Sequence, residues 1–565
     1  MPTRPGTRRR EPDIAGIARS LLGIDALRPG QEAAIRSVLD GRDTLVVMPT
    51  GSGKSAIYQI AGQVLGGLVI VVSPLIALQR DQVDSLDDSA GLRAAELNST
   101  LGDSEREALF DAIRRNPRLF LFLAPEQLAN EETLARLAAA RPTLFVVDEA
   151  HCISEWGHDF RPDYLRLGAF LAQLGHPTTL ALTATAAQPV REEIVQRLGM
   201  REPNILVRGF DRPNIHLAVR TFREEADKRE ALLEQAAAAT GPGIIYAARR
   251  RDTEAIAAAL AGRGVRAAAY HAGLRASERE AIQAAFMAGE TDVMVATIAF
   301  GMGIDKPDIR YVYHDSVSDS LDTYYQEFGR AGRDGAPAEA LLFYDPEDLG
   351  LRRFQSGVGE LKAENVRPVL HAIRAADGPL DPAALREELD LQDTELIRVL
   401  GRLEDVGAVT IAPTGEVEAT DSDLTIAAAA EAAERAQAQL QRFASSRLEM
   451  MRQYAETTTC RRAFLLNYFG EAYEGPCGNC DTCEAGTAQA TTAEEPFPLQ
   501  STVVHSTWGE GTVMHYENGN VVVLFREAGY RTLSLDLVRE EGLLRPAPDA
   551  RAGTASADPA AGTDA

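Results

Sequence analysis

The most constraining feature of the sequence is an alternation of two kinds of segment that runs from about residue 11 to residue 345. Short apolar runs rich in β-branched residues alternate with Ala-, Leu- and Glu-rich stretches of helical composition. The apolar runs are TLVVM, LVIVVS, RLFLFLA, TLFVVDEA, TLALTAT, GIIYAA, VMVAT and IRYVYH. This order predicts parallel α/β layers covered on both faces. The set is too long for one doubly wound sheet, so we predict two lobes, 11–207 and 208–345, with their boundary in the segment VRGFDRPNIHLAVRTF (207–222).

Two helical segments follow the lobes. The first, 346–425, begins as a charged helical connector and then shows three helix-length pieces and two short strand candidates around Pro413–Thr414–Gly415. Three helices and a hairpin are the order of a winged helix, which we predict here. The second segment, 426–485, is rich in Ala, Gln and Arg and ends on a cluster of cysteines.

The C-terminal part of the chain differs in composition. Residues 486–498 are rich in Ala, Thr and Pro, which predicts a linker. Residues 499–545 alternate between apolar and polar side chains around an Asn518–Gly519 turn signal, which predicts a small β module. Residues 546–565 form an Ala/Asp/Gly/Pro tail that cannot bury a core, so we expect it to be disordered.

The composition is that of an ordinary globular protein. With 45% hydrophobic and 25% charged residues, it argues against a disordered, collagen-like or disulfide-stapled chain. The 58 Lys and Arg residues against 83 Asp and Glu give a net charge of −25, so attraction to nucleic acid has to come from local basic patches. No apolar signal-peptide core follows the basic N-terminus, and the most apolar run, 66–78, is shorter than the ~20 residues of a spanning helix and carries Ser73 and Pro74. We therefore expect a cytoplasmic chain without a membrane segment.

The segment MPTGSGKS (48–55) has the features of a phosphate-binding loop, because it follows an apolar strand and precedes a helical stretch. Backbone amides from Gly51 to Ser55 can cradle phosphates, Lys54 can reach the β and γ oxygens, and the Ser55 hydroxyl can hold Mg²⁺. Met48 stands where the general pattern has its first glycine. The alternative is a chance Gly-rich turn between a strand and a helix.

A second motif reduces that doubt. TLFVVDEAHC places Asp148 and Glu149 at the end of an apolar strand, where an Asp can bind Mg²⁺ and a Glu can polarise water. These acids could instead only cap a following helix. Further along, QEFGRAGRDG carries Arg330 and Arg333 on a Gly-interrupted segment suited to an arginine finger. The alternative is that both arginines form salt bridges on a solvated helix face, but glycines between them favour close approach to a ligand.

The clustered cysteines offer four thiolates, the number that a closed structural Zn²⁺ site requires. They are Cys460, Cys477, Cys480 and Cys483. A four-cysteine iron–sulfur cluster and unliganded buried thiols are the two alternatives. Cys152, which stands apart from the cluster, is expected to be a small buried residue without chemistry.

With these motifs in this order, the chain resembles superfamily 2 helicases and, within them, the RecQ family of DNA helicases. The segments that carry the resemblance are LRPGQ (27–31), MPTGSGKS, SPLIALQRDQV (73–83), DEAHCISEWGHDFRPDY (148–164), LTATA (182–186), IIYAARR (244–250), ATIAFGMGIDKP (296–307) and QEFGRAGRDG. The resemblance covers about residues 13–350 and the cysteine region.

The resemblance implies an α/β fold with two RecA-like lobes, a helical zinc-binding module, and ATP-driven 3′ to 5′ translocation on single-stranded DNA with unwinding of a 3′-tailed duplex. The nucleotide-binding residues that it implies are Arg28, Gln31, Thr50, Gly51, Ser52, Gly53, Lys54, Ser55 and Asp305. It assigns Mg²⁺ to Ser55 and Asp148, the general base to Glu149, the arginine finger to Arg333 with Arg330 beside it, and zinc to the four cysteines. Ile24 replaces the aromatic residue that many relatives have upstream of Gln31.

The resemblance also implies DNA contacts in the aromatic-rich loop after DEAH, by Trp156, His158, Phe160 and Arg161. This is chemically sensible on its own, because aromatic rings stack on any base and Arg neutralises phosphate. Arg461 and Arg462, next to the first clustered cysteine, are further candidates for phosphate contact.

Two parts of the chain depart from well-known RecQ proteins. The winged-helix-like segment precedes the cysteines instead of following them, and its wing is acidic, so a structural or partner-binding role is at least as well supported as DNA contact. The β module resembles the small Tudor- or SH3-like barrel that ends UvrD-type helicases. That likeness implies a protein partner such as RNA polymerase, and the alternative is a stable barrel without a partner.

We therefore expect an ATP-dependent DNA helicase acting in repair, recombination or replication restart. One rival is an RNA remodeller, against which the aromatic-rich loop and the cysteines argue. The other is an ATP-gated DNA-binding or docking factor that recruits partners without unwinding. It is disfavoured because such a factor does not need Lys54, Glu149 and Arg333 together.

Overall fold

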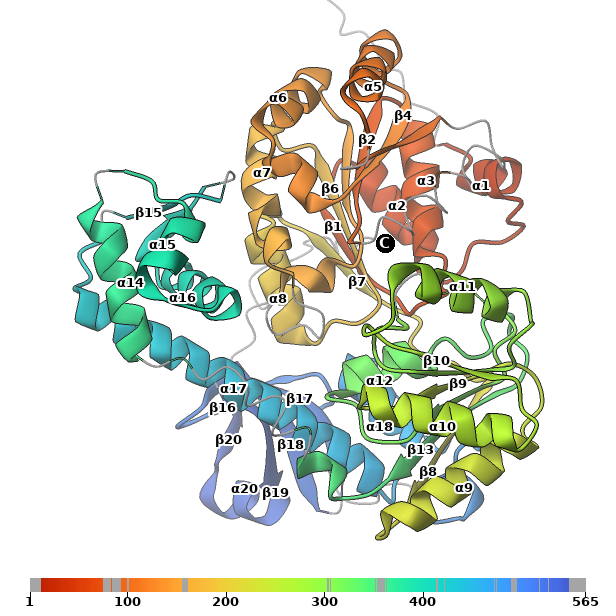
Figure 1. The fold of residues 1–565 in the computed structure, drawn as a ribbon. Coiled ribbons are helices and arrows are strands. Elements are labelled where there is room, and N and C mark those ends of the chain that lie inside the picture. The colour runs from red at the N-terminus through yellow and green to blue at the C-terminus, as the bar shows by residue number, and fades with distance from the viewer. Residues whose placement is uncertain are drawn as a thin grey trace, which may run out of the picture. The chain divides into compact units, whose positions relative to one another are not determined.

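The structure is a computed structural model. It describes residues 12–74, 83, 93–98, 101–154, 161–301, 304, 306–350, 352, 361, 363–376, 378–412, 415–420, 422–471, 473, 475–488, 495–517, 519–526 and 528–547. The chain divides into two compact units, Met1–Gln489 and Ala490–Ala565, which are described one after the other (Figure 1). Among the described residues, no helix combines the length and the apolar character needed to cross a membrane.

The first lobe is built on a seven-stranded parallel sheet with the order β3-β4-β2-β5-β6-β1-β7. Its strands are β1 (Thr44–Val47), β2 (Leu68–Val72), β3 (Ala94–Leu97), β4 (Leu119–Leu123), β5 (Leu144–Val147), β6 (Thr178–Thr183) and β7 (Asn204–Val207). Its α-helices are α1 (Ile14–Leu22), α2 (Gln31–Leu39), α3 (Lys54–Leu65), α5 (Asp103–Arg115), α6 (Glu131–Ala140), α7 (Leu167–Gln173) and α8 (Gln188–Arg197). Short 3₁₀ turns are η1 (Pro125–Ala129), η2 (Ala150–Ile153) and η3 (Pro162–Arg166). Strands β1, β2, β4 and β5 are buried along their whole length, which explains their uninterrupted apolar sequences.

The second lobe is built on a six-stranded parallel sheet with the order β10-β11-β9-β12-β13-β8. Its strands are β8 (Ile215–Thr221), β9 (Gly243–Tyr246), β10 (Ala267–Tyr270), β11 (Val293–Ala296), β12 (Tyr311–His314) and β13 (Ala338–Tyr344). Its helices are α9 (Glu225–Ala238), α10 (Arg250–Gly262), α11 (Ala276–Met287) and α12 (Leu321–Phe328). Apolar residues of α9 and α10 pack on the sheet (Figure 1). The predicted α/β class with two parallel-sheet lobes is confirmed.

The segment after the second lobe has the predicted order of three helices and a hairpin. These elements are α14 (Ala363–Ala375), α15 (Pro382–Leu389), α16 (Asp393–Asp405), β14 (Val409–Ile411) and β15 (Val417–Ala419). Their core also takes in Ala429, Ala430 and Ala433 from the first turns of the long helix α17 (Ile426–Glu456). Pro413 and Thr414, which the sequence places at the hairpin turn, lie outside the described residues.

Helix α17 leads to the cysteine module, which continues with α18 (Arg461–Phe469) and the short helix α19 (Asp481–Glu484). The module packs on β8, the edge strand of the second lobe. Cys480 forms an isolated parallel bridge with Leu217, and a carboxylate oxygen of Asp481 accepts a hydrogen bond from the Val219 amide at 2.9 Å. The cysteines are therefore placed at the edge of the second sheet.

The second unit is an antiparallel five-stranded sheet with the order β19-β18-β17-β16-β20. Its elements are β16 (Thr502–His505), β17 (Gly509–Glu517), β18 (Asn520–Phe525), β19 (Gly529–Ser534), α20 (Leu535–Glu541) and β20 (Leu544–Pro546). A register shift between Val513 and His515 interrupts the pairing of β17 with β18. Phe497, which the sequence places in the linker, packs in the core of this unit. The predicted β module is present, whereas its closure into a barrel stays a prediction.

Candidate nucleotide site and metal centre

The segment 48–53 forms a tight loop between β1 and α3. Gly51 and Gly53 have φ angles of +76° and +77°, a left-handed conformation that costs other residues roughly 1–2 kcal/mol. Thr50 precedes the first of these glycines, and Ser52 between them is buried. The loop ends at the N-terminus of a 12-residue helix, where free amides and the helix dipole favour an anion. This local geometry fits a phosphate cradle, and phosphate binding by the loop stays a prediction.

Lys54 is the first residue of α3 and turns back over the loop. Its ammonium group donates hydrogen bonds to the carbonyls of Met48 at 3.0 Å and Pro49 at 3.2 Å. Burial lowers the pKa of Lys54, and the nearby carboxylates of Glu149 and Asp148 oppose that shift. The structure therefore brings the lysine of the loop and the two acids of the second motif within electrostatic reach of one another.

Asp148 and Glu149 follow β5 at the carboxyl edge of the first sheet. Asp148 is 7% exposed, and its carboxylate accepts a hydrogen bond from the Glu149 amide at 3.0 Å. Glu149 has a φ of +47°, a left-handed conformation that costs a non-glycine residue roughly 1–2 kcal/mol. A carboxylate oxygen of Glu149 lies 3.3 Å from Nδ1 of His151, and the same nitrogen lies 3.0 Å from the Thr183 hydroxyl at the end of β6.

Ser55, the candidate magnesium ligand on α3, forms a hydrogen bond with the hydroxyl of the buried Tyr58, and burial is the main cause that raises the pKa of that phenol. Neither His151 nor Thr183 was predicted from the sequence to be functional. Both lie inside the DEAH and LTATA motifs, but the contact between these two motifs in space is not visible in the sequence.

Gln31 and Arg28 lie beside the phosphate loop. The Gln31 side chain donates to the carbonyls of Ser52 at 3.0 Å and Gly53 at 2.9 Å, and its oxygen accepts from the Arg28 amide at 2.8 Å. The Arg28 guanidinium donates to the carbonyl of Gly51. Both side chains therefore contact the loop backbone, and the adenine contact that the resemblance implies stays a prediction.

The two arginines of the second lobe have different surroundings. A methyl group built on Gly51 would come within 3.2 Å of Cγ of Arg333, so this arginine reaches the phosphate loop of the first lobe. Its charge also acts to lower the pKa of Lys54. Arg330 is 3% exposed and forms a hydrogen bond with the phenol of Tyr246, whose pKa burial raises to about 12. Arg333 faces the candidate nucleotide site, whereas Arg330 is buried in its own lobe.

The aromatic-rich loop is described only at its ends. Trp156, His158 and Phe160 lie outside the described residues, as does Asp305 of the ATIAFGMGIDKP segment. Arg161 donates from its guanidinium to the carbonyl of Pro74 at 2.9 Å. Tyr164, fully buried at the end of the segment, donates from its hydroxyl to the carbonyl of Asp148 at 3.2 Å. The predicted DNA-binding segment is thus joined directly to the residue that precedes Glu149.

The four clustered cysteines converge on one point. Their sulfur atoms all lie within 4.8 Å of one another, and those of Cys477 and Cys483 are 4.0 Å apart. Four sulfurs bound tetrahedrally to zinc at about 2.3 Å are about 3.8 Å apart, so the arrangement fits a structural Zn²⁺ site. The Asn479 backbone amide donates to the sulfur of Cys477 at 3.3 Å, and the Thr482 hydroxyl lies 3.3 Å from the sulfur of Cys480. Cys152 is fully buried and apart from this cluster, as expected.

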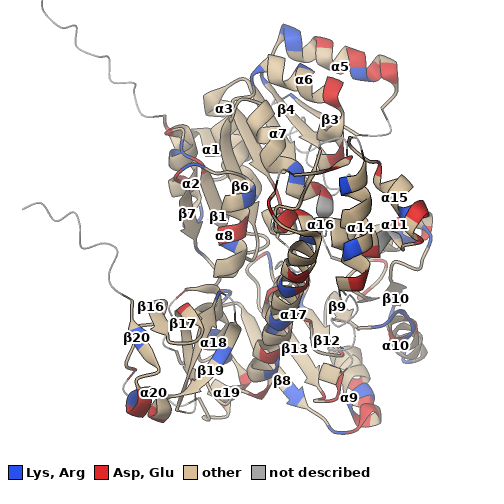
Figure 2. Cartoon of the chain, turned by 90° about the vertical axis from the view of Figure 1, so that its left-hand side faces the viewer, with Lys and Arg blue, Asp and Glu red and all other residues tan. Residues whose placement is uncertain are grey.

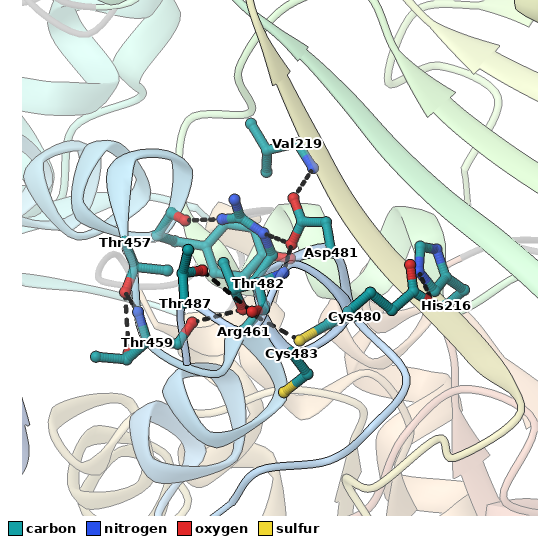
Figure 3. Close-up of polar contacts among 12 residues, drawn as sticks. His216, Val219, Thr457, Thr459, Arg461, Cys480, Asp481, Thr482, Cys483 and Thr487 are labelled. Atoms are coloured by element: carbon teal, nitrogen blue, oxygen red, sulfur yellow. Dashed lines mark hydrogen bonds and ion pairs between the residues drawn. The ribbon is translucent and has the colours of Figure 1, made fainter. Parts of the chain in front are cut away.

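The expectation that Arg461 and Arg462 face DNA is wrong. Both residues are 5% exposed. The Arg461 guanidinium binds the carboxylate of Asp481 at 2.5 Å and the carbonyl of Tyr454 at 2.7 Å, and Figure 3 shows Arg461 and Asp481 facing each other beside Val219 of β8. Neither guanidinium is exposed for a DNA contact, because each is buried and its charge is compensated by partners within the protein.

Arg462 is paired in the same way, but with the segment between the lobes. Its guanidinium binds the carboxylate of Asp211 at 2.6 Å and the carbonyl of Ile215 at 2.8 Å. From the sequence this segment was predicted only to separate the two lobes, and two of its residues, Arg212 and Asn214, were not identified as functional candidates. Both contact the loop that carries Arg330 and Arg333. The available signal was an Arg-Pro-Asn tripeptide between the lobes.

Three family models match the chain. A DEAD/DEAH box helicase model matches residues 28–193, a helicase conserved C-terminal domain model matches 227–335, and a RecQ zinc-binding model matches 422–484. These matches fall on the first lobe, on the second lobe and on the segment with the four cysteines.

Individual proteins extend the comparison. The chain is 36% identical to the probable ATP-dependent DNA helicase RecS of Bacillus subtilis over 464 residues, which cover 82% of this chain and 89% of RecS. It is also 36% identical to the ATP-dependent DNA helicase RecQ of Pasteurella multocida, over 83% of this chain but only 61% of that protein. Among solved structures, the DUF1998 helicase MrfA bound to DNA and AMPPNP covers 74% of this chain and 63% of its own chain, with a TM-score of 0.52 and 20% identity. At that identity, the structural likeness shows the fold alone.

Proposed function

The chain belongs to the RecQ family of ATP-dependent DNA helicases, and we propose that it uses ATP hydrolysis between its two lobes to move 3′ to 5′ along single-stranded DNA and to unwind duplexes. The family inferred from the sequence motifs is confirmed. The polarity, the DNA structure and the residue roles that follow are the proposal, with repair, recombination or replication restart as the expected processes.

The observation that carries the proposal is the convergence of groups from both lobes on one loop. Lys54 and the acids Asp148 and Glu149 come from the first lobe, and Arg333 reaches Gly51 from the second. Hydrolysis of ATP needs a phosphate cradle, a group that orients water and a cation that stabilises charge on the transferred phosphoryl group. Residues suited to each of these roles lie close together, which supports a motor over a docking factor that only binds nucleotide.

We assign one role to each of these residues. The amides of Gly51 to Ser55 and the ammonium of Lys54 bind the phosphates, and Glu149 orients the attacking water. The Ser55 hydroxyl and the Asp148 carboxylate suit a Mg²⁺ ion, which supplies charge neutralisation at the phosphates. Arg333 stabilises the charge that develops in the transition state. Because His151 contacts both Glu149 and Thr183, it is the group through which strand β6 can adjust the Glu149 carboxylate.

DNA is proposed to bind at the aromatic-rich loop, supported by the direct hydrogen bond from Tyr164 to the carbonyl of Asp148. The overall charge does not favour DNA binding, because the net charge of the chain is −25. Figure 2 shows that acidic and basic residues are interleaved along α17. Base stacking and local arginines must therefore supply the affinity.

The second unit is proposed to contact a protein, with RNA polymerase as the candidate that the Tudor-like resemblance supplies. Its support is an aromatic group in which Trp508 stacks on His505 at 4.2 Å and lies under the guanidinium of Arg531 at 5.5 Å. We also propose that the protein acts in the cytoplasm, because chromosomal DNA lies in the cytoplasm of bacteria such as the two from which the relatives come.

The decisive experiment compares the wild type, Lys54→Ala and the control Arg263→Ala in ATP hydrolysis and strand separation. Arg263 is a suitable control because it forms a surface pair with Glu230. Substrates are 3′-tailed DNA, 5′-tailed DNA and single-stranded RNA, with zinc content matched between proteins. We expect DNA-stimulated hydrolysis, unwinding of the 3′-tailed duplex only, and a loss on the order of 100-fold or more for Lys54→Ala alone.

Other outcomes contradict defined parts of the proposal. Hydrolysis stimulated by DNA without strand separation would leave a translocase and remove unwinding. Stimulation by RNA but not DNA would favour the RNA remodeller. No stimulation by either nucleic acid would favour the ATP-gated docking factor.

A further inference from the structure

The loop that carries Arg330 and Arg333 is held from outside by two side chains of the segment between the lobes. The Arg212 guanidinium donates to the carbonyls of Gly329 at 2.9 Å, Ala331 at 2.7 Å and Gly332 at 3.0 Å. The Asn214 amide donates to the carbonyls of Gly332 at 2.8 Å and Ala336 at 2.9 Å. Two side chains therefore bind the backbone on both sides of Arg333.

The half-buried Arg212 guanidinium is paired with backbone carbonyls. Within the described part of the chain, no carboxylate lies at ion-pair distance from its guanidinium, and burial lowers its pKa. Its charge is compensated by backbone carbonyls of the loop instead. A planar fork that donates to three carbonyls of one short segment holds that backbone in a single path, which a flexible ammonium group cannot do.

The loop is shaped to accept these contacts. Gly332 has a φ of +56°, and a methyl group built there would lie 2.4 Å from the Asn214 amide nitrogen and 2.8 Å from the carbonyl oxygen of Ala336. The Gly332 amide donates to the carbonyl of Ile309 at 2.8 Å. Glycine at this position is required by the close approach of Asn214, so the spacing of the Gly-interrupted segment has a structural cause.

The segment that carries Arg212 is itself anchored. Asp211 is bound by Arg462 of α18 at 2.6 Å, and the carbonyl of Pro213 accepts from the Asn479 side chain at 2.8 Å. The ring of Phe210 stacks on that of Phe469 with 4.6 Å between centroids. Arg212 therefore lies between neighbours that the cysteine module holds in place, so its guanidinium has a defined position relative to the loop.

We propose that Arg212 and Asn214 are positioning residues for ATP hydrolysis, which hold the backbone of the 329–336 loop so that Arg333 reaches the phosphate loop. This inference rests on the proposed function, because it requires Arg333 to act on the nucleotide. Neither residue touches the nucleotide in this scheme. Their effect on hydrolysis passes through Arg333 alone.

The test is a double-mutant cycle measured by steady-state ATP hydrolysis on the full-length, zinc-loaded protein with saturating single-stranded DNA. Arg212→Ala is expected to lower kcat by about 10- to 100-fold, the scale of a misplaced catalytic group, with the KM for ATP within about twofold of wild type. Arg212→Lys keeps the charge but not the fork, so it is expected to restore only part of kcat. Arg333→Ala is expected to lower kcat by about 10³-fold.

The cycle separates positioning from general stability. If Arg212 acts through Arg333, the double variant Arg212→Ala/Arg333→Ala has the same kcat as Arg333→Ala. Losses that multiply overturn the inference, as does a rise in KM with unchanged kcat. If Arg212→Ala does not fold, Asn214→Ala is the second variant, with a smaller expected loss of kcat that should also be absent in the Arg333→Ala background. Arg263→Ala is the control. If Arg333→Ala itself retains the wild-type kcat, the proposed role of Arg333 as arginine finger is refuted. This result differs from multiplying losses, which would refute only the positioning role of Arg212.

Discussion

Replacing Phe210 by Ala should loosen the cysteine module from the second lobe. The ring of Phe210 is 1% exposed, stacks on Phe469 at 4.6 Å with 3° between the planes, and lies 5.5 Å from the ring of Tyr325. Truncation of a buried phenylalanine costs about 3–5 kcal/mol, which includes about 0.5–1.5 kcal/mol for each aromatic pair. We take about 4 kcal/mol, because both partner rings stay in place and leave a cavity.

The assay is hydrogen exchange of the backbone amides of α18, read by mass spectrometry. If α18 exchanges through local opening, about 4 kcal/mol corresponds to about 10³-fold faster exchange, whereas β10 and β11 at the opposite edge of the sheet keep their protection. Phe222→Ala is the matched control, since Phe222 is only half-buried and its ring is 5.9 Å from that of Phe343. Exchange in α18 that stays within tenfold of wild type, in a folded protein, would refute this account of the contact.

Three further predictions follow from other parts of the chain. Removing zinc with a chelator should loosen the cysteine module, because structural zinc sites contribute about 10–16 kcal/mol of apparent folding energy in zinc-finger peptides and the Cys480–Leu217 bridge lies at this site. Limited proteolysis should then cut between 477 and 486, and an unchanged digest would argue against a structural metal. Burial lowers the pKa of His515 from 6.5 to about 4, so the unfolded chain binds more protons than the folded chain between these values. The second unit should therefore lose up to about 3 kcal/mol of stability through His515 as the pH falls from about 6.5 towards 4, and His505, whose pKa burial also lowers, adds a loss of the same sign. Melts followed by Trp508 fluorescence should show a shallower slope in His515→Phe than in wild type. Arg330→Ala should lower the melting temperature through the loss of a buried hydrogen bond to Tyr246, which is worth about 1–3 kcal/mol. Arg333→Ala should lower it by less, because Arg333 is only half-buried; equal shifts for both would contradict their different surroundings.

Much of the nucleotide site was predictable because its residues lie in short motifs with fixed spacing. A loop of this length can bind an anion in only a few ways, so the spacing identifies the glycines at 51 and 53, the lysine at 54 and the acids after strand β5. The four cysteines were predictable for the same reason. Their spacing limits which metal sites they can form, and the sulfur atoms do converge.

The roles of the arginines were not predictable in this way. Arg330 and Arg333 are three residues apart and similar in sequence context, yet one is buried beside Tyr246 and the other reaches Gly51. Arg461 and Arg462 were expected to face DNA and instead pair with Asp481 and Asp211. An arginine side chain is long and pairs with whichever carboxylate or carbonyl the packing brings near, so its partner is not encoded in its neighbours along the chain.

The sequence by itself determined the family, the two α/β lobes, the phosphate loop and the cysteine cluster, because apolar periodicity and short motifs are local properties. Only the tertiary structure decided that the segment between the lobes holds the arginine loop, through contacts between Arg212 and residues more than a hundred positions away. Such contacts form where two folded surfaces meet. Their partners are therefore set by packing rather than by spacing along the chain.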